Sequence, residues 1–307
     1  MRATIIGGAG RVGSNAAFAL QMGGIFTEVA LIDLMAEAAQ GEALDLRHGA
    51  ALAAWQRFVA GGYELLAGTD LLMITAGLRR KPEESRLDLI NRNVALFRSI
   101  LAEAKAAGLG REAICLVVAN PVDILTHLAA TSGIFAPGRV LGLGNVLDST
   151  RLRSLLAERL AVDPTQVNAL VLGEHGDSMV PIWSTAAVAG VPLVAVPGFS
   201  REVAEDVFAQ TRQGGAEAIR LKGGAGYAVA LCIRQVAESI ALDRHAVLPV
   251  SSPQRGAYGI SDVSLSVPTV VGRAGVLACL QMPLAPEEQQ GLLASAQVLR
   301  ETLAQIS

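Results

Sequence analysis

The first half of the 307-residue chain alternates short apolar runs with longer segments that have helical spacing. The apolar runs, which we interpret as strands, cover residues 3–6, 28–32, 71–75 and 114–119, and the helical segments cover 12–22, 36–52 and 85–107. Strands that are apolar throughout are typical of a parallel sheet with helices on both faces, because neither face then meets water. We therefore predict an α/β fold with a doubly wound parallel sheet.

The pattern changes after about residue 142, where strands group apart from helices. We expect a helix over 147–160, a strand over 166–172, a helical stretch over 201–243 interrupted by Gly214-Gly215 and Gly223-Gly224, strands over 247–250 and 263–271, and a closing helix over 286–306. Grouped strands near turn residues predict antiparallel pairing and an α+β arrangement. We place a first domain at residues 1–142 and a second, α+β domain at 143–307, packed rigidly with a cleft between them.

The composition narrows the choice of partners and location. Hydrophobic residues make up 51% of the chain and the net charge is −3, so a strongly basic surface for nucleic acid is not expected. No apolar run approaches the roughly 20 residues of a membrane helix, and the N-terminus enters the first strand without a leader. Cys115, Cys232 and Cys279 have neither metal-ligand nor disulfide spacing. We therefore expect a cytoplasmic protein with buried thiols, no metal, and no nucleic-acid or membrane partner.

A glycine-rich turn follows the first strand and opens the first helix. Its spacing fits the G-x-G-x-x-G pattern of Rossmann folds, in which the backbone approaches a pyrophosphate at a helix N-terminus. Asp33 ends the next strand, where a carboxylate accepts the ribose hydroxyls of NAD and repels the 2′-phosphate of NADP; the alternative is that Asp33 only caps the following helix. We expect NAD as the cofactor. The residues predicted to bind it here are Gly7, Gly8, Gly10, Arg11, Val12, Gly13 and Asp33.

His175 lies between glycines at the end of a predicted strand, where the backbone can approach a ligand. Histidine suits proton donation to a ketone oxygen during hydride transfer, because its pKa lies near neutrality. Asp148 is the candidate carboxylate that would orient it, although a residue at the start of a helix can instead serve as an N-cap. Arg151 follows on the same helix face and offers a planar fork for a substrate carboxylate; the alternative is a surface arginine.

The segment 75–86 is long, polar and basic, and it follows a predicted strand of the sheet. It therefore lies at the carboxyl edge of the sheet, where ligands bind in doubly wound folds. Two interpretations remain open: a mobile lid over an anion, or a solvated loop at the start of a helix.

Together these motifs resemble the lactate/malate dehydrogenase family over nearly the whole chain. They occur in the family's order: the glycine turn, Asp33, the loop 75–86, and the segments 118–123, 147–151 and 173–177. The resemblance implies a hydride transfer between NAD and a small 2-hydroxy acid.

The resemblance also implies a role for each residue that matches a family motif. His175 would donate and accept the proton, Asp148 would orient it, and Arg151 would bind the substrate carboxylate. Arg86 would polarise the carbonyl, and Asn120 would hydrogen bond near the substrate and the nicotinamide. Further residues expected at the cofactor are Thr75, Ala76, Gly77, Asn93, Val118 and Asn120.

Within the family, the side chain six residues before the lid arginine, which is Arg86 here, distinguishes substrates. Glutamine at this position accompanies lactate enzymes, and arginine accompanies malate enzymes. Arg80 occupies this position, where it would bind the second carboxylate of oxaloacetate. On this basis the chain resembles malate dehydrogenases with lactate-dehydrogenase-like folds, and we predict interconversion of (S)-malate and oxaloacetate. Glu84 and the segment 86–89 resemble lactate enzymes, so L-lactate dehydrogenase or a broader 2-hydroxy acid dehydrogenase is the alternative. Family members form dimers and tetramers, so we expect a homo-oligomer.

Three other classes fit the sequence less well. Short-chain dehydrogenases require Tyr-x-x-x-Lys, and none of Tyr63, Tyr227 and Tyr258 has a lysine four residues later. NAD-dependent glycosidases use metal-ligating cysteine and histidine, a context that the cysteines here lack. A non-enzymatic NAD-binding protein would keep the glycine turn without the complete catalytic set.

Overall fold

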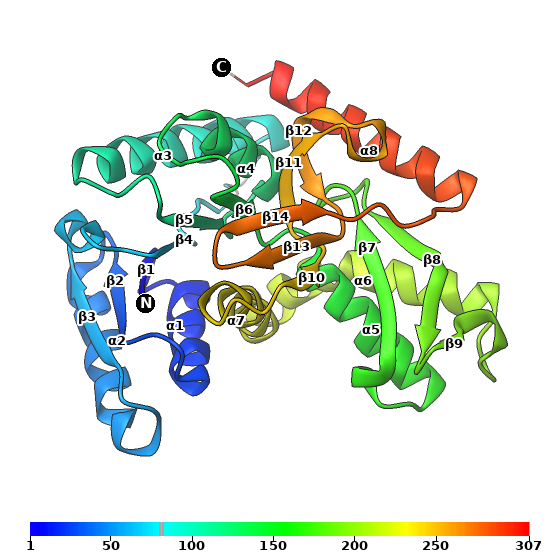
Figure 1. Ribbon diagram of the computed structural model, residues 1–307, viewed down its shortest axis with the longest axis horizontal. Coiled ribbons are helices and arrows are strands. Elements are labelled where there is room, and N and C mark those ends of the chain that lie inside the picture. The colour runs from blue at the N-terminus through cyan, green and yellow to red at the C-terminus, as the bar shows by residue number, and fades with distance from the viewer. Residues whose placement is uncertain (80, 82, 307) are drawn as a thin grey trace.

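The computed structural model describes residues 1–79, 81 and 83–306. Within these residues the largest sheet has eight strands (Figure 1). They are β1 (Arg2–Ile6), β2 (Glu28–Ile32), β3 (Arg57–Gly61), β4 (Leu71–Ile74), β5 (Ile114–Val117), β6 (Val140–Gly142), β11 (Ser251–Arg255) and β12 (Ser261–Ser266). Their order is β12-β11-β6-β5-β4-β1-β2-β3, and the strands from β3 to β6 are parallel. This order defines the doubly wound dinucleotide-binding fold, so the predicted fold class is confirmed.

Helices cover both faces of this sheet. The α-helices of the described chain are α1 (Arg11–Gly23), α2 (Ala36–His48), α3 (Arg86–Ala106), α4 (Val122–Thr131), α5 (Val146–Leu160), α6 (Arg201–Lys222), α7 (Tyr227–Ala241) and α8 (Pro286–Ala304). α1, α2 and α7 pack on one face, and α3 and α4 pack on the other (Figure 1). Successive strand residues alternate between these two cores: Ile5 and Leu31 pack toward α1, whereas Ile6 and Ile32 pack toward α3. The strands are apolar throughout because both of their faces are buried.

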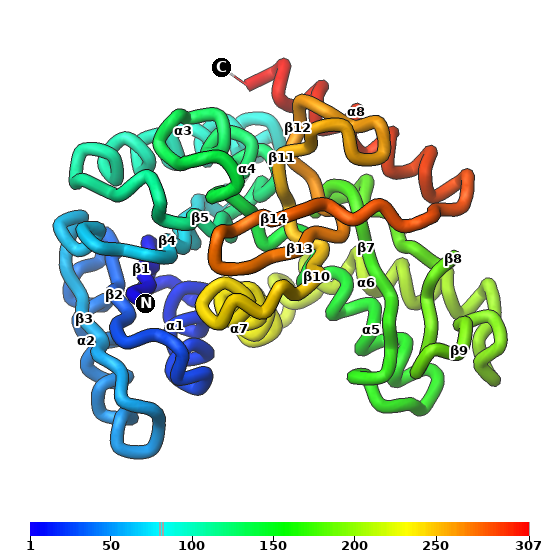
Figure 2. Tube along the Cα trace, viewed as in Figure 1, coloured from blue at the N-terminus to red at the C-terminus, as the bar shows by residue number. Residues whose placement is uncertain are grey.

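The second half of the chain adds two small antiparallel sheets. The remaining strands are β7 (Val167–Leu172), β8 (Val180–Val188), β9 (Val191–Pro192), β10 (Ala246–Leu248), β13 (Thr269–Gly272) and β14 (Gly275–Cys279). One sheet contains β7, β8 and β9, and the other contains β10, β13 and β14. α5 packs against β7 and α6, and Figure 2 shows these elements gathered on the right, in green and yellow-green. This α+β arrangement agrees with the predicted fold class; the division after residue 142 stays a prediction.

The structure differs from the predicted elements in the second half. The predicted strand 263–271 is two strands, β12 and β13, separated by Val267 and Pro268, because proline has no N–H for a ladder. β11 and β12 extend the large sheet in antiparallel fashion instead of forming a sheet of their own. The pair Gly214-Gly215 lies inside α6 without breaking it, whereas α6 ends at Gly223, whose φ of 75° favours glycine.

Short 3₁₀-helices connect some of these elements. They span Gly49–Leu52, Tyr63–Leu66, Pro164–Gln166, Leu193–Ala195 and Ala257–Gly259. None of the helices in the described part of the chain combines the length and the apolar character that a membrane crossing requires.

Candidate active site

The glycine turn between β1 and α1 has the geometry that a pyrophosphate requires. Gly7 has a φ of 89°, and the N–H groups of Gly7 and Gly8 donate to the Ile32 carbonyl at 2.8 and 3.0 Å, which ties the turn to β2. A Cβ on Gly13 would lie 2.1 Å from the Gly7 carbonyl oxygen, so the close approach requires glycine. No described side chain caps the N-terminus of α1, so its first N–H groups are available to an anion.

Asp33 joins the end of β2 to the glycine turn. Its Oδ2 accepts the backbone N–H of Ala9 at 3.0 Å, and its Oδ1 accepts that of Met35 at 3.0 Å. The N-cap residue of α2 is Met35, so Asp33 is not the N-cap of this helix. Its carboxylate lies at the cofactor turn, and its contact with a ribose stays a prediction.

A cavity of 730 Å³ extends from the glycine turn to residues of the second half. The predicted site residues that line it are Gly7, Gly10, Arg11, Val12, Gly13, Thr75, Gly77, Val118, Asn120, Arg151 and His175. The predicted residues that the structure places outside its lining are Gly8, Asp33, Ala76, Arg86, Asn93 and Asp148. Arg80 lies outside the described residues. The cavity therefore joins the cofactor turn to two of the catalytic candidates, His175 and Arg151.

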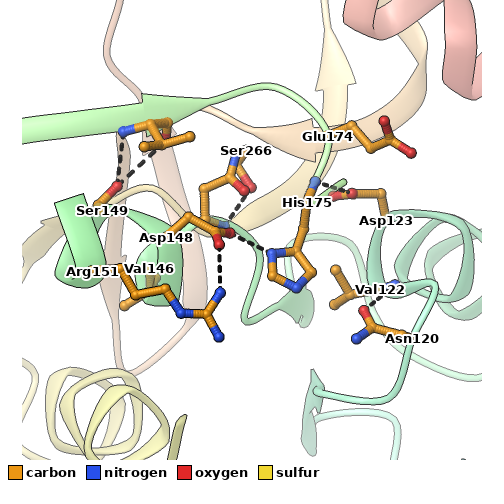
Figure 3. Close-up of polar contacts among 12 residues, drawn as sticks. Asn120, Val122, Asp123, Val146, Asp148, Ser149, Arg151, Glu174, His175 and Ser266 are labelled. Atoms are coloured by element: carbon orange, nitrogen blue, oxygen red, sulfur yellow. Dashed lines mark hydrogen bonds and ion pairs between the residues drawn. The ribbon is translucent and has the colours of Figure 1, made fainter. Parts of the chain in front are cut away.

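His175, Asp148 and Arg151 form one network at the wall of this cavity (Figure 3). Asp148 is fully buried in the first turn of α5. Its Oδ2 contacts Nδ1 of His175, and its Oδ1 accepts a hydrogen bond from Nη1 of Arg151 at 3.0 Å. The N-cap residue of α5 is Asn145, so the alternative role of Asp148 as an N-cap is wrong.

The electrostatics of the pair suit proton donation. Burial alone would raise the pKa of Asp148, but the charges and hydrogen bonds of His175 and Arg151 outweigh it and lower the pKa. Burial would lower the pKa of His175, yet the Asp148 carboxylate outweighs it and raises the pKa. Because Asp148 is ionised at neutral pH, Nδ1 of His175 keeps a proton and donates a hydrogen bond to the carboxylate. Nε2 is then left to exchange a proton with a ligand in the cavity.

Two glycines of α6 face the side chain of Arg151. A Cβ on Gly214 would lie 3.4 Å from Cδ of Arg151, and one on Gly215 would lie 3.8 Å from its terminal nitrogens. A longer side chain at either position would occupy the space of the guanidinium. Sequence analysis treats this glycine pair as a helix interruption and misses its role; the available signal is a pair of glycines within helical spacing.

The two predicted asparagines differ in position. Asn120 follows β5, accepts the Val122 N–H at 3.3 Å, and lies near His175 in Figure 3. Asn93 is buried in α3, where its Oδ1 accepts the backbone N–H of Leu78 at 2.8 Å. Asn93 therefore holds the loop after β4 and does not line the cavity.

Arg86 lies in the first turn of α3, outside the cavity lining. Its guanidinium contacts Asp177 at 2.6 Å and Glu174 at 3.4 Å, and 63% of its side chain is exposed. To act on a substrate in the cavity, Arg86 would have to leave these two carboxylates. Its role at the lid stays a prediction.

Asp123 is a residue near the site to which sequence analysis assigns no role. It is buried in the first turn of α4, and its Oδ2 accepts the backbone N–H of His175 at 2.7 Å (Figure 3). The signal in the sequence is a carboxylate at the second position of a largely apolar helix that begins after Asn120 and Pro121.

Comparison with known proteins agrees with this geometry. The family profile "lactate/malate dehydrogenase, NAD binding domain" matches residues 1–142, and "lactate/malate dehydrogenase, alpha/beta C-terminal domain" matches residues 145–307. The chain belongs to the lactate/malate dehydrogenase family. The resemblance inferred from the motifs is confirmed, and so is NAD as the cofactor. The protein is an NAD-dependent oxidoreductase of this family.

Individual relatives match over nearly their whole length. An L-lactate dehydrogenase of Thermoanaerobacter sp. (strain X514) is 38% identical over 97% of each chain, and one of Synechococcus sp. (strain JA-3-3Ab) is 40% identical over 100% of this chain and 99% of its own. Among solved structures, the minor L-lactate dehydrogenase of Enterococcus mundtii in its ligands-bound form has a TM-score of 0.95 and 34% identity, covering 100% of this chain and 98% of its own.

These relatives correct the predicted substrate. The prediction of malate and oxaloacetate is wrong, because relatives that match the full length are named L-lactate dehydrogenases. The prediction gives the charge of Arg80 more weight than the carboxylate of Glu84 in the same loop. In the structure Glu84 contacts Arg92 at 2.6 Å and accepts the Lys81 N–H at 2.8 Å, with only 8% of its side chain exposed. The loop therefore contains a fixed carboxylate that a count of its arginines neglects.

Replacing Asp33 with serine is expected to erode the preference for NADH over NADPH. The change removes the acceptor for the ribose hydroxyls and the repulsion of a 2′-phosphate. A hydrogen bond to a charged group contributes about 1.5–3 kcal/mol, so kcat/KM for NADH should fall about tenfold to a hundredfold. Steady-state kinetics with both cofactors measure the change, and Asp33→Glu, which keeps the carboxylate, is the control. If Asp33→Ser kept the cofactor preference of the unmodified enzyme, Asp33 would not be a ligand of the ribose.

Proposed function

We propose that the protein is an NAD-dependent L-lactate dehydrogenase that interconverts pyruvate and (S)-lactate. The observation that carries the proposal is the contact of His175 with Asp148 beside Arg151, on the wall of a cavity that also contains the cofactor turn. The names of the full-length relatives support pyruvate as the keto acid.

Arg151 binds the carboxylate of pyruvate in this account. Its guanidinium lines the cavity while Nη1 remains bonded to Asp148, so the side chain is held in one position before the substrate arrives. A planar fork held in this way pairs with a carboxylate in one orientation and so fixes the orientation of the ketone group for hydride transfer.

His175 donates the proton that completes the reduction. Bound NADH would supply the hydride that adds to C2 of pyruvate and would leave as NAD⁺. The carbonyl oxygen then takes the proton from Nε2 of His175, which leaves neutral imidazole and lactate. Asp148 keeps Nδ1 protonated and stabilises the imidazolium before transfer. In the oxidation of lactate the same nitrogen accepts the proton.

Opposite pH dependences of the two directions follow from the raised pKa of His175. Reduction needs the imidazolium, so its rate falls as pH rises through this pKa. Oxidation needs neutral imidazole, so its rate rises over the same range.

NADH oxidation with pyruvate, with chiral analysis of the product, tests the proposed function. Absence of (S)-lactate would reject it.

We also propose that the chain forms a homo-dimer or homo-tetramer. Large apolar side chains are exposed on helices of one sheet face: Phe18 and Met22 of α1 are 56% and 60% exposed, and Tyr227 and Leu231 of α7 are 71% and 61% exposed. Such apolar patches are typical of subunit contacts. Light scattering should give a multiple of 31.8 kDa, and a monomer would contradict the proposal.

The three cysteines bear on the location of the protein. Cys115 and Cys232 are buried, and all three thiols are free. Free thiols are typical of a reducing compartment, so we place the protein in the cytoplasm.

A further inference from the structure

Asp123 is a buried carboxylate that the mechanism above does not use. Only 2% of its surface is exposed, and its Oδ2 accepts the backbone N–H of His175 at 2.7 Å. Its other oxygen, Oδ1, makes no close hydrogen bond within the described residues, and the Ser251 hydroxyl is the neighbour that helps to stabilise the carboxylate. A core carboxylate with so few partners is unfavourable, and an asparagine of the same shape could accept the same N–H. The hydrogen bond to His175 therefore does not explain why this buried position has a carboxylate instead of an amide.

The charged groups around Asp123 indicate which group its carboxylate stabilises. Burial raises its pKa to about 6, a hydrogen bond from Ser251 and the N–H and charge of His175 lower the pKa, and the charge of Glu174 raises it. The strands packed on α4 bring Arg255 and Asp262, which are both exposed. His175 is thus the positive charge that acts on Asp123, and Asp123 in turn raises the pKa of His175.

Helix α8 also packs on α4, and its buried carboxylate has a different environment. Glu288 accepts N–H groups of Trp183, Ser184 and Ala285 at 2.7 to 2.9 Å. Burial would raise its pKa, but these hydrogen bonds outweigh burial and lower it. Glu288 is therefore a structural carboxylate against which Asp123 can be compared.

We propose that Asp123 is a positioning residue for proton transfer, whose carboxylate fixes the backbone of His175 and whose charge stabilises the imidazolium together with that of Asp148. Asp148 acts on Nδ1 at the ring, and Asp123 acts from the backbone side on another element, α4. The inference rests on the proposed role of His175 in reducing a 2-keto acid.

The pH profile of Asp123→Asn tests the charge separately from the hydrogen bond, because the amide oxygen can still accept the His175 N–H. Without the second negative charge, the pKa of His175 should fall. The rate of pyruvate reduction should therefore decline at a lower pH than in the unmodified enzyme. We expect kcat/KM for pyruvate to stay within about twofold at about pH 6 and to drop about tenfold at about pH 8.5.

Thermal stability gives a second readout that a purely structural role would not produce. A group whose pKa is raised in the folded state lowers stability as pH rises from its unfolded to its folded pKa, here from about 4 to about 6. Asp123→Asn should therefore have a higher Tm than the unmodified enzyme at neutral pH. Glu288→Gln should have a lower Tm and an unchanged pH profile, because its carboxylate is stabilised by hydrogen bonds.

Asp123→Ala removes the acceptor as well as the charge, so it should lose kcat at every pH. An Asp123→Asn enzyme with the unmodified pH profile, or one that is less stable or fails to fold, would overturn the inference. Failure of the proposed function would be seen separately, as an unmodified enzyme that does not reduce pyruvate.

Discussion

Replacing His175 with asparagine is expected to lower kcat for pyruvate reduction by about two to four orders of magnitude. Asparagine has no titratable proton for the carbonyl oxygen, and the imidazolium that Asp148 stabilises cannot form. The glycine turn lies on another element, so NADH should bind almost as tightly as before. Steady-state kinetics and a fluorescence titration with NADH separate the two effects.

His245→Asn is the matched control for this substitution. His245 is largely exposed, outside the cavity lining, and its φ of 53° is one that asparagine tolerates. Its kcat should equal that of the unmodified enzyme. A His175→Asn enzyme that retains most of its kcat would contradict the role of His175 as proton donor.

Replacing Arg151 with leucine is expected to lower kcat/KM for pyruvate by about two to three orders of magnitude. The change leaves the substrate carboxylate in the cavity without a cation, and it also leaves Asp148 with His175 as its remaining ion-pair partner. Removing one partner of a buried ion pair costs about 3–5 kcal/mol, which gives the stated factor. Most of the loss should occur in KM, measured with saturating NADH.

Arg151→Lys keeps the positive charge without the planar fork, so its kcat/KM should lie between those of the leucine variant and the unmodified enzyme. Unchanged KM for pyruvate in Arg151→Leu would show that another group binds the carboxylate.

The sequence predicts the longer strands that are buried on both faces and misses strands that lie at the sheet edge or are very short. β2 is apolar in almost every position and was predictable from this pattern. β3 lies at the edge of the sheet, begins with the exposed Arg57 and ends in Gly61, so its apolar run is limited to Phe58, Val59 and Ala60. β6 has only three residues, too few for a periodic signal. These two strands were missed because their edge position and short length become apparent only in the assembled sheet.

Local motifs predict the site where the chain itself makes the geometry, as in the turn around Gly13. The contact between Asp148 and His175 joins residues 27 positions apart, so spacing offered Asp148 only as one candidate with an N-cap as the alternative, and the family resemblance favoured the pairing. The space that Gly214 leaves for Arg151 depends on how α6 packs on α5, which no spacing encodes.

Substrate choice was the least predictable property, because the two loop residues that bear on it, Arg80 and Glu84, indicate different substrates. Arg80 alone indicates a dicarboxylate, but Glu84 adds a carboxylate to the same loop, and Arg92 of α3 pairs with it. Sequence order does not show which of these charges neutralise one another, because the ion pair spans eight positions and two elements.

The central claim is tested most directly by kcat/KM for pyruvate and for oxaloacetate, measured with saturating NADH on the unmodified enzyme. The account predicts a clearly higher value for pyruvate, because relatives that match the full length are named L-lactate dehydrogenases. An equal or higher value for oxaloacetate would contradict the assignment as an L-lactate dehydrogenase.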